Sequence, residues 1–112
     1  MKVVIAEQQP ESPNPHGIVA RAVHSTEYVQ VSYLTFKPGE KLRWHITPVD
    51  AFFFVIEGVA QVEIGDESEV APAGALVHNP AGIKHRIVNH GDGELRVLVV
   101  KTPAQTTGTQ LL

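Results

Sequence analysis

The 112-residue sequence contains no cysteine, which excludes disulfide bonds, thiolate metal ligands and cysteine nucleophiles. It also lacks any apolar run near the ~20 residues that a membrane-spanning helix needs. The apolar start over residues 1–6 is shorter than a secretory signal peptide requires. We therefore expect a cytoplasmic protein that does not associate with membranes.

Clustered basic charge is also missing. Nine Lys and Arg residues face twelve Asp and Glu residues, for a net charge of −3, and the basic residues are scattered along the chain. Binding to a phosphate backbone needs Lys and Arg gathered on one surface. We therefore expect no nucleic-acid partner.

Long helices have little room in this chain, because its eight prolines and nine glycines recur at short intervals. The segments between them are rich in Val, Ile, Tyr, Phe and Thr, which favour strands. We predict strands over residues 2–6, 18–24, 28–36, 41–46, 51–57, 59–64, 75–79, 84–89 and 94–101. Many short strands separated by turns predict an all-β sandwich or barrel.

The length is enough for one domain and too little for two, so we assign residues 1–112 to a single barrel. Its core is expected over about 18–101. Residues 1–17 are interpreted as an N-terminal strand and loop. Residues 102–112 are polar with a Leu-Leu end, and we interpret them as a loose tail or an arm that docks on a partner subunit.

The run from Phe52 to Ile56 is apolar without alternation, so both faces of this strand must be covered. The barrel interior covers one face, and either a second sheet or a partner subunit covers the other. Together with the tail, this run makes a homodimer the expected assembly.

Candidate chemistry centres on six histidines, because without cysteine a transition-metal site must use His with Asp or Glu. We interpret His16, in a proline-rich leader, and His90, in a turn, as exposed. His24, at a strand end, is interpreted as structural or surface. The candidates that remain are His45, His78 and His85.

Two spaced motifs surround these candidates. Five residues match the pattern G-x5-P-x-G-x2-H-x3-N, namely Gly74, Pro80, Gly82, His85 and Asn89. Upstream, Gly39, His45 and Gly58 keep part of the pattern G-x5-H-x-H-x3–4-E-x6-G. On these motifs the sequence resembles the cupin superfamily over roughly residues 28–101. The resemblance implies a small single-domain cupin, an all-β double-stranded β-helix or jelly-roll barrel.

The resemblance also implies a ligand set, since cupins that bind a divalent metal usually use three His and one Glu. His45 and His85 fill the first and third His positions, whereas Thr47 and Ala51 stand at the second His and the Glu positions. His78 is the candidate replacement, and Asp50 would need a β-bulge to turn inward. The predicted site is therefore His45, His85 and His78, with Zn, Ni, Mn or Fe as the divalent metal. The alternative is a metal-free pocket in which the imidazoles form hydrogen bonds.

Strand alternation extends the candidate pocket. His85 and Ile87 share one face of their strand, and the charged Lys84 and Arg86 share the other, so the first pair is expected to point inward. The resemblance places His45 inside, which brings Arg43 toward the pocket rim. The candidate ligand pocket comprises Arg43, Thr47, Ala51, Phe53 and Ile87.

Three functions agree with these observations, and no catalytic residue is assigned. The first is a metal-dependent dioxygenase, decarboxylase or lyase acting on a small oxygenated molecule. The second is a metal-free isomerase or epimerase with a pocket His as general base and Arg43 or Lys84 binding an anionic group. The third is a non-catalytic module that holds a small ligand among Trp44, Phe52, Phe54 and the histidines. The fold alone does not choose among them.

Overall fold

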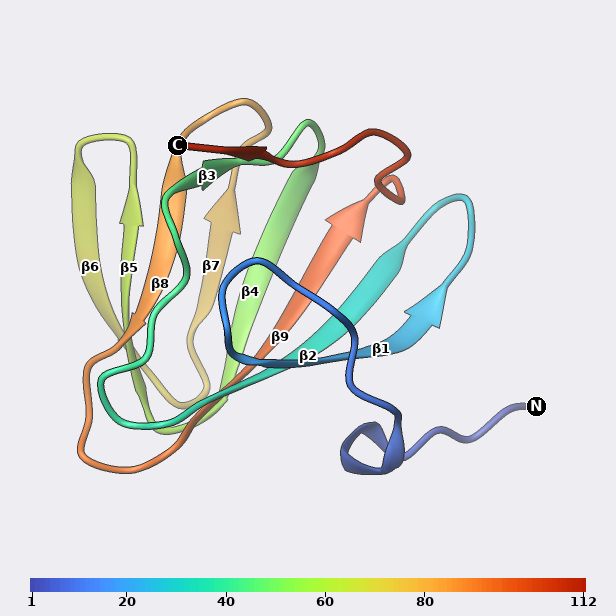
Figure 1. The fold of residues 1–112 in the computed structure, drawn as a ribbon, viewed down its shortest axis with the longest axis horizontal. Coiled ribbons are helices and arrows are strands. Elements are labelled where there is room, and N and C mark those ends of the chain that lie inside the picture. Colours follow the sequence, from blue (N-terminus) through green and yellow to red (C-terminus); the bar gives the residue numbers. More distant parts are fainter.

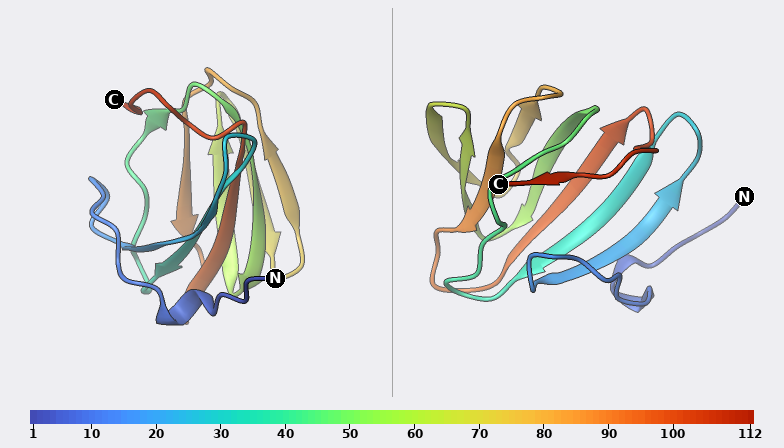
Figure 2. Two further views of the ribbon diagram at one scale, coloured as in Figure 1. Left: turned by 90° about the vertical axis from the view of Figure 1, so that its right-hand side faces the viewer. Right: turned by 45° about the horizontal axis from the view of Figure 1, so that its top comes forward.

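The computed structural model describes residues 1–112 as two five-stranded sheets in which every pairing is antiparallel (Figures 1 and 2). The first sheet has the order β1 (Val19–Ser25), β2 (Gln30–Phe36), β9 (Leu95–Thr102), β4 (Asp50–Glu57) and β7 (Leu76–Asn79). The second has the order β10 (Gln110–Leu111), β3 (His45–Ile46), β8 (His85–Asn89), β5 (Val59–Ile64) and β6 (Glu67–Pro72). This architecture confirms the predicted all-β double-stranded β-helix.

The core lies between the sheets, where alternate side chains of each strand point inward. On β4 the inward residues are Ala51, Phe53 and Val55, all buried. On β8, Ile87 is fully buried between His85 and Asn89. Burying a side chain of this size stabilises the fold by about 1.5–3 kcal/mol. The rigid inner faces also set the direction of every side chain in the site below.

One glycine is required by close approach of two strands. Gly58, between β4 and β5, has a φ of +84°, which side chains other than glycine rarely adopt. A Cβ atom at this position would lie 2.4 Å from the carbonyl oxygen of Glu94. Any substitution there would therefore push the turn between β4 and β5 away from the backbone at the start of β9.

Three segments differ from the predicted strands. Residues 2–6 form no strand, and η1 (Ala6–Gln8), a 3-10 helix, follows them, because no strand of either sheet pairs with this short apolar run. Residues 67–72, rich in acidic and small side chains, form the edge strand β6, since pairing with β5 overrides their weak strand preference. Only His45–Ile46 of the predicted strand 41–46 is regular. No helix in the structure has the length and apolar character needed to span a bilayer.

The interpretation of residues 102–112 as a loose or partner-bound tail is wrong, because the tail folds back on its own barrel. Gln110 pairs with Ile46 and Leu111 with His45, so β10 lies beside β3 (Figure 1). The backbone N–H of Leu112 also donates to the carbonyl of Trp44, at 3.0 Å. The tail thus holds the strand that carries His45.

The outer face of β4 is not covered by any second sheet of the chain. Phe54 and Ile56 are 37% and 43% exposed, and the neighbouring Leu76 of β7 is 61% exposed. Of the two covers expected for this face, a second sheet is therefore ruled out, and a partner subunit is untested. The homodimer suggested by the sequence stays a prediction for this surface.

Asn79 generates a stability prediction, because its side chain is fully buried and neither polar atom of its amide has a hydrogen-bond partner. A buried amide without partners costs about 1–3 kcal/mol. We expect Asn79→Leu, which has the same number and branching of side-chain heavy atoms, to raise the free energy of unfolding by about that amount in urea denaturation. Asn79→Ala is the control, and its cavity should lower stability. A loss of stability in Asn79→Leu would contradict the prediction and indicate a buried water bound to the amide.

Candidate functional site

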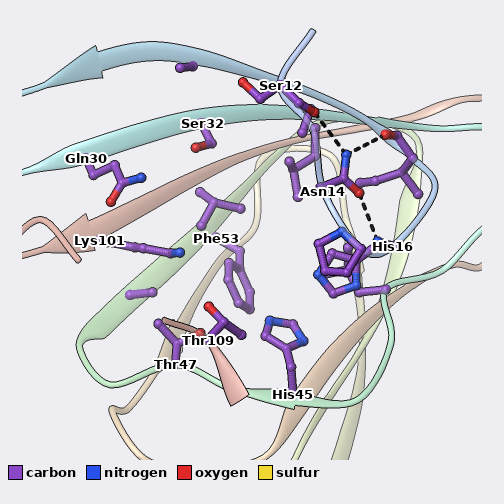
Figure 3. Close-up of a pocket in the computed structure, with 18 of the residues that line it drawn as sticks. Ser12, Asn14, His16, Gln30, Ser32, His45, Thr47, Phe53, Lys101 and Thr109 are labelled. Atoms are coloured by element: carbon purple, nitrogen blue, oxygen red, sulfur yellow. Dashed lines mark hydrogen bonds between the residues drawn. The ribbon is translucent and has the colours of Figure 1, made fainter. Parts of the chain in front are cut away.

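A cavity of about 290 Å³ opens between the two sheets (Figure 3). Inward residues of β1, β2, β4 and β9 form one wall, and the proline-rich segment 12–16 forms another. Its polar lining includes Ser32, Gln30 and Thr109, and Phe53 supplies an aromatic surface. Inward side chains of a pleated sheet stand on every second residue, which is why residues distant in sequence meet here.

Three imidazoles gather at one side of this cavity. His45 and His85 are direct partners in the β3–β8 pairing, and their ring centroids lie 4.1 Å apart. The ring of His16 lies 4.9 Å from that of His45. The interpretation of His16 as an exposed leader residue is therefore wrong. Segment 12–16 turns back over the barrel because the Asn14 side chain donates to the Ile18 carbonyl at 2.9 Å and accepts from the His16 backbone N–H at 3.0 Å.

Backbone contacts define where each ring carries its proton. The Nδ1 atom of His45 lies 2.7 Å from the Arg43 carbonyl, and that of His85 lies 3.1 Å from the Ile83 carbonyl. A carbonyl only accepts, so in both neutral rings Nδ1 is the donor and Nε2 keeps a free lone pair. The Nδ1 of His16 instead accepts the backbone N–H of Arg43 at 2.9 Å, which leaves its proton on Nε2.

The cavity keeps these rings neutral near pH 7. Burial, reinforced by the nearby His45, lowers the pKa of His85 to about 4. Burial also lowers the pKa of His16 to about 4, with smaller effects of His45 and Arg43. The pKa of His45 is lowered as well, again mainly by burial. Since a buried cation loses hydration, the uncharged form of each ring is favoured.

The predicted pocket residues divide between the cavity and other places. Thr47, Ala51 and Phe53 line the cavity. Ile87 does not, because it is fully buried in the core. The side chain of Arg43 is exposed and outside the lining, since the chain before β3 is irregular and does not follow strand alternation there.

His78 and Asp50 lie away from the imidazoles. His78 is exposed on β7, with its Nε2 atom 3.8 Å from the Asp50 carboxylate. Asp50 also accepts the backbone N–H of Ala81 at 2.8 Å, and so it holds the turn that precedes His85. Strand alternation turns both side chains away from the interior, which Asn79 and Ala51 face instead.

The aromatic residues proposed for a non-catalytic ligand site also lie outside the cavity. Trp44 packs against two cations outside the cavity, with the Arg86 guanidinium carbon 4.6 Å and the Lys84 Nζ 5.4 Å from its ring centroid. Phe54 belongs to the exposed outer face of β4, together with Phe52. The aromatic residue that does face the imidazoles is Phe53, whose ring centroid lies 5.9 Å from that of His85.

Among the lining residues that the sequence predictions missed, three carry polar groups central to the site: His16, Lys101 and Thr109. Lys101 had a usable signal, because it continues the inward positions Leu95, Val97 and Val99 of β9 as a charged residue. His16 and Thr109 lie outside the regular strands, where no periodicity indicates direction.

The donor set does not fit the metal site that the motifs imply. His45 and His85 offer one lone pair each, at Nε2. The lone pair of His16, at Nδ1, already accepts the Arg43 N–H. No Asp or Glu lines the cavity, and no group of three or more His, Asp or Glu is arranged to hold a metal ion. Transition-metal sites in proteins ordinarily use at least three such ligands. The residues of the cavity therefore do not form the metal site that the motifs imply.

Comparison with protein families and curated sequences gives two matches. The family described as "Cupin domain" matches residues 32–101. The uncharacterized protein SCO3923 of Streptomyces coelicolor is 37% identical over 57 residues, which are 51% of this chain and 53% of that protein. The chain thus spans about half the length of the curated relative it matches.

Solved structures share the fold at low identity. The polyketide cyclase RemF from Streptomyces resistomycificus has a TM-score of 0.84 at 17% identity, covering 100% of this chain and 85% of that one. A conserved protein of Klebsiella pneumoniae with a double-stranded β-helix domain has a TM-score of 0.83 at 20% identity, covering 99% and 96%. At these identities the likeness extends to the barrel and not to the chemistry.

Protonation of the imidazoles should make stability depend on pH. The pKa values of His16 and His85 fall from 6.5 to about 4 on folding, so between these values the unfolded chain binds more protons than the folded one. The free energy of unfolding should therefore fall as the pH is lowered from 6.5 to about 4. Urea denaturation at several pH values in this window measures it. The free energy of unfolding of His85→Gln should fall less over this window, because one titrating ring is missing. A pH dependence identical to that of the wild type would contradict the lowered pKa assigned to His85.

Proposed function

This chain belongs to the cupin family, and on that premise we propose that its cavity binds a small carbonyl compound and moves a proton on it without a metal. The observation that carries this proposal is the opposite hydrogen-bonding state of adjacent imidazoles. His45 and His85 present lone pairs at Nε2, and His16 presents an N–H at Nε2. A base beside a donor is what abstraction of a proton next to a carbonyl group requires.

The step balances with these groups alone. The Nε2 lone pair of His45 or His85 takes the proton from the carbon beside the carbonyl. The C–H electron pair forms a carbon–carbon double bond, and the carbonyl pair moves to oxygen, giving an enolate. The His16 Nε2–H donates to that oxygen as its charge develops. Return of the proton to the same carbon on the other face, or to a neighbouring carbon, gives epimerisation or isomerisation.

The surroundings support this chemistry. Both bases are buried, with 7% of His45 and 2% of His85 exposed, so water competes little for their lone pairs. Their lowered pKa keeps their lone pairs unprotonated at neutral pH. Each ring is also fixed by its backbone contact at Nδ1, which holds the lone pair in one direction.

Exchange of carbon-bound hydrogen with solvent deuterium tests the proposal. The protein is incubated in D2O with a panel of small ketones, 2-keto acids and β-dicarbonyl compounds, and NMR follows the hydrogens beside the carbonyl. We expect catalysed exchange that falls about 100-fold or more in whichever of His45→Ala and His85→Ala removes the base that takes the proton, the usual contribution of a general base. His24→Ala, which removes an exposed imidazole on β1, should exchange at the wild-type rate.

Two other results would contradict the proposal. Exchange that a chelator abolishes and an added divalent metal restores would support the metal-dependent alternative. A panel compound that stabilises the protein to heat and undergoes no exchange would support the non-catalytic binding module.

A further inference from the structure

The lining of the cavity contains a single Lys or Arg side chain, that of Lys101 on β9. Leu95, Val97 and Val99 precede it at the inward positions of the strand, so alternation sends its ammonium into the interior. Figure 3 shows its Nζ atom pointing into the cavity, with His45 and His16 beyond. An ammonium on an apolar strand face loses the water that hydrates its charge, and this loss is unfavourable unless another group compensates it.

No carboxylate compensates this charge. No Asp or Glu lines the cavity, and no ion pair involves Lys101. Its one side-chain hydrogen bond goes from Nζ to the Gln105 Oε1 atom at 2.6 Å. An ammonium has three N–H donors, so two remain for a molecule in the cavity.

We propose that Lys101 is the anion-binding group of this cavity and that the ligand carries one carboxylate, bound by its ammonium at the end away from His16. The proposed proton transfer is needed only to assign the other end of the ligand, where a carbonyl group would lie beside the imidazoles. Burial lowers the pKa of Lys101, as expected for a cation without a counter-ion, and a bound carboxylate would reverse that effect.

The rest of this end suits a carboxylate better than a phosphate. Gln30 pairs with Lys101 in the β2–β9 register, Ser32 and Thr109 also line the cavity, and all three side chains are neutral. A phosphate dianion would need a second cation, a helix N-terminus or a glycine-rich loop, and the lining contains none of them. A carboxylate balances a single ammonium and accepts from hydroxyl and amide donors as well.

Gln105 is the positioning residue for Lys101. While its Oε1 accepts from Lys101, its Nε2 donates to the Thr107 carbonyl at 2.7 Å and to the Thr109 hydroxyl at 2.9 Å. Its backbone N–H also donates to the Gln30 side chain at 3.2 Å. The Gln105 amide is thus fixed at both its oxygen and its nitrogen, and it holds the Lys101 ammonium close to Thr109 in the cavity wall.

Binding of benzoate compared with benzamide tests the proposal. The two probes have the same shape, and benzoate has no hydrogen beside a carbonyl on a saturated carbon, so its binding requires no proton transfer. NMR titration of the full chain should show benzoate binding at least about tenfold more tightly than benzamide, as expected for a hydrogen bond to a charged group. Inorganic phosphate should bind more weakly than benzoate.

Two variants should remove the preference. Lys101→Met keeps the length of the side chain without its charge, and Gln105→Glu places a carboxylate against the ammonium. Both should bind the two probes equally, whereas Lys84→Met, outside the cavity, should keep the wild-type preference. Equal binding of the probes by the wild type, no benzoate binding at tens of millimolar, or a preference that survives in both variants would overturn the proposal.

The two proposals fail separately. A benzoate preference that depends on Lys101, without any deuterium exchange on the carbonyl panel, would keep the anion site and reject the proton transfer. Deuterium exchange on neutral ketones at the same rate in Lys101→Met, without a benzoate preference, would do the reverse.

Discussion

The site depends on the register between β3 and β8, which sets His45 directly opposite His85. A strand of two residues does not fix this register by itself. The bridge between Lys41 and Val88 and the bond from the Leu42 N–H to the Ile87 carbonyl, at 2.9 Å, extend the pairing upstream. On the other edge β10 pairs with the same residues. A slip of one residue would turn His45 to the opposite face, so these contacts keep the two lone pairs in one cavity.

The opposite hydrogen-bonding states of the imidazoles come from the backbone of one residue. Arg43 gives its N–H to the Nδ1 of His16 and its carbonyl to the Nδ1 of His45. The backbone of each residue carries one N–H donor and one C=O acceptor, so a ring that contacts the N–H and a ring that contacts the C=O take opposite tautomers. The irregular chain before β3 makes this possible, since in a regular ladder both groups would pair with a neighbouring strand.

Much of the barrel and part of the site could be predicted from the sequence, for identifiable reasons. The spaced glycines, prolines and histidines indicated the family, and Ala51 and Phe53, both predicted for the pocket, do lie on the inner face. Arg43 was selected for its side chain, yet it acts through its peptide groups, which every residue has and no motif reveals. His16 reaches the cavity through the contacts of Asn14, and the C-terminal tail pairs with β3. Neither arrangement produces a periodic pattern in the sequence from which it could be predicted.

The cavity therefore divides its chemistry between the barrel and the segments that cross it. The barrel strands supply the lone pairs of His45 and His85, held by a register that is costly to change. Segment 12–16 supplies the N–H of His16, and segment 105–111 orients the ammonium of Lys101. The donors that would recognise a ligand thus depend on irregular segments, where substitutions disturb few buried contacts. In this arrangement the specificity of the cavity can change while its bases and its core stay in place.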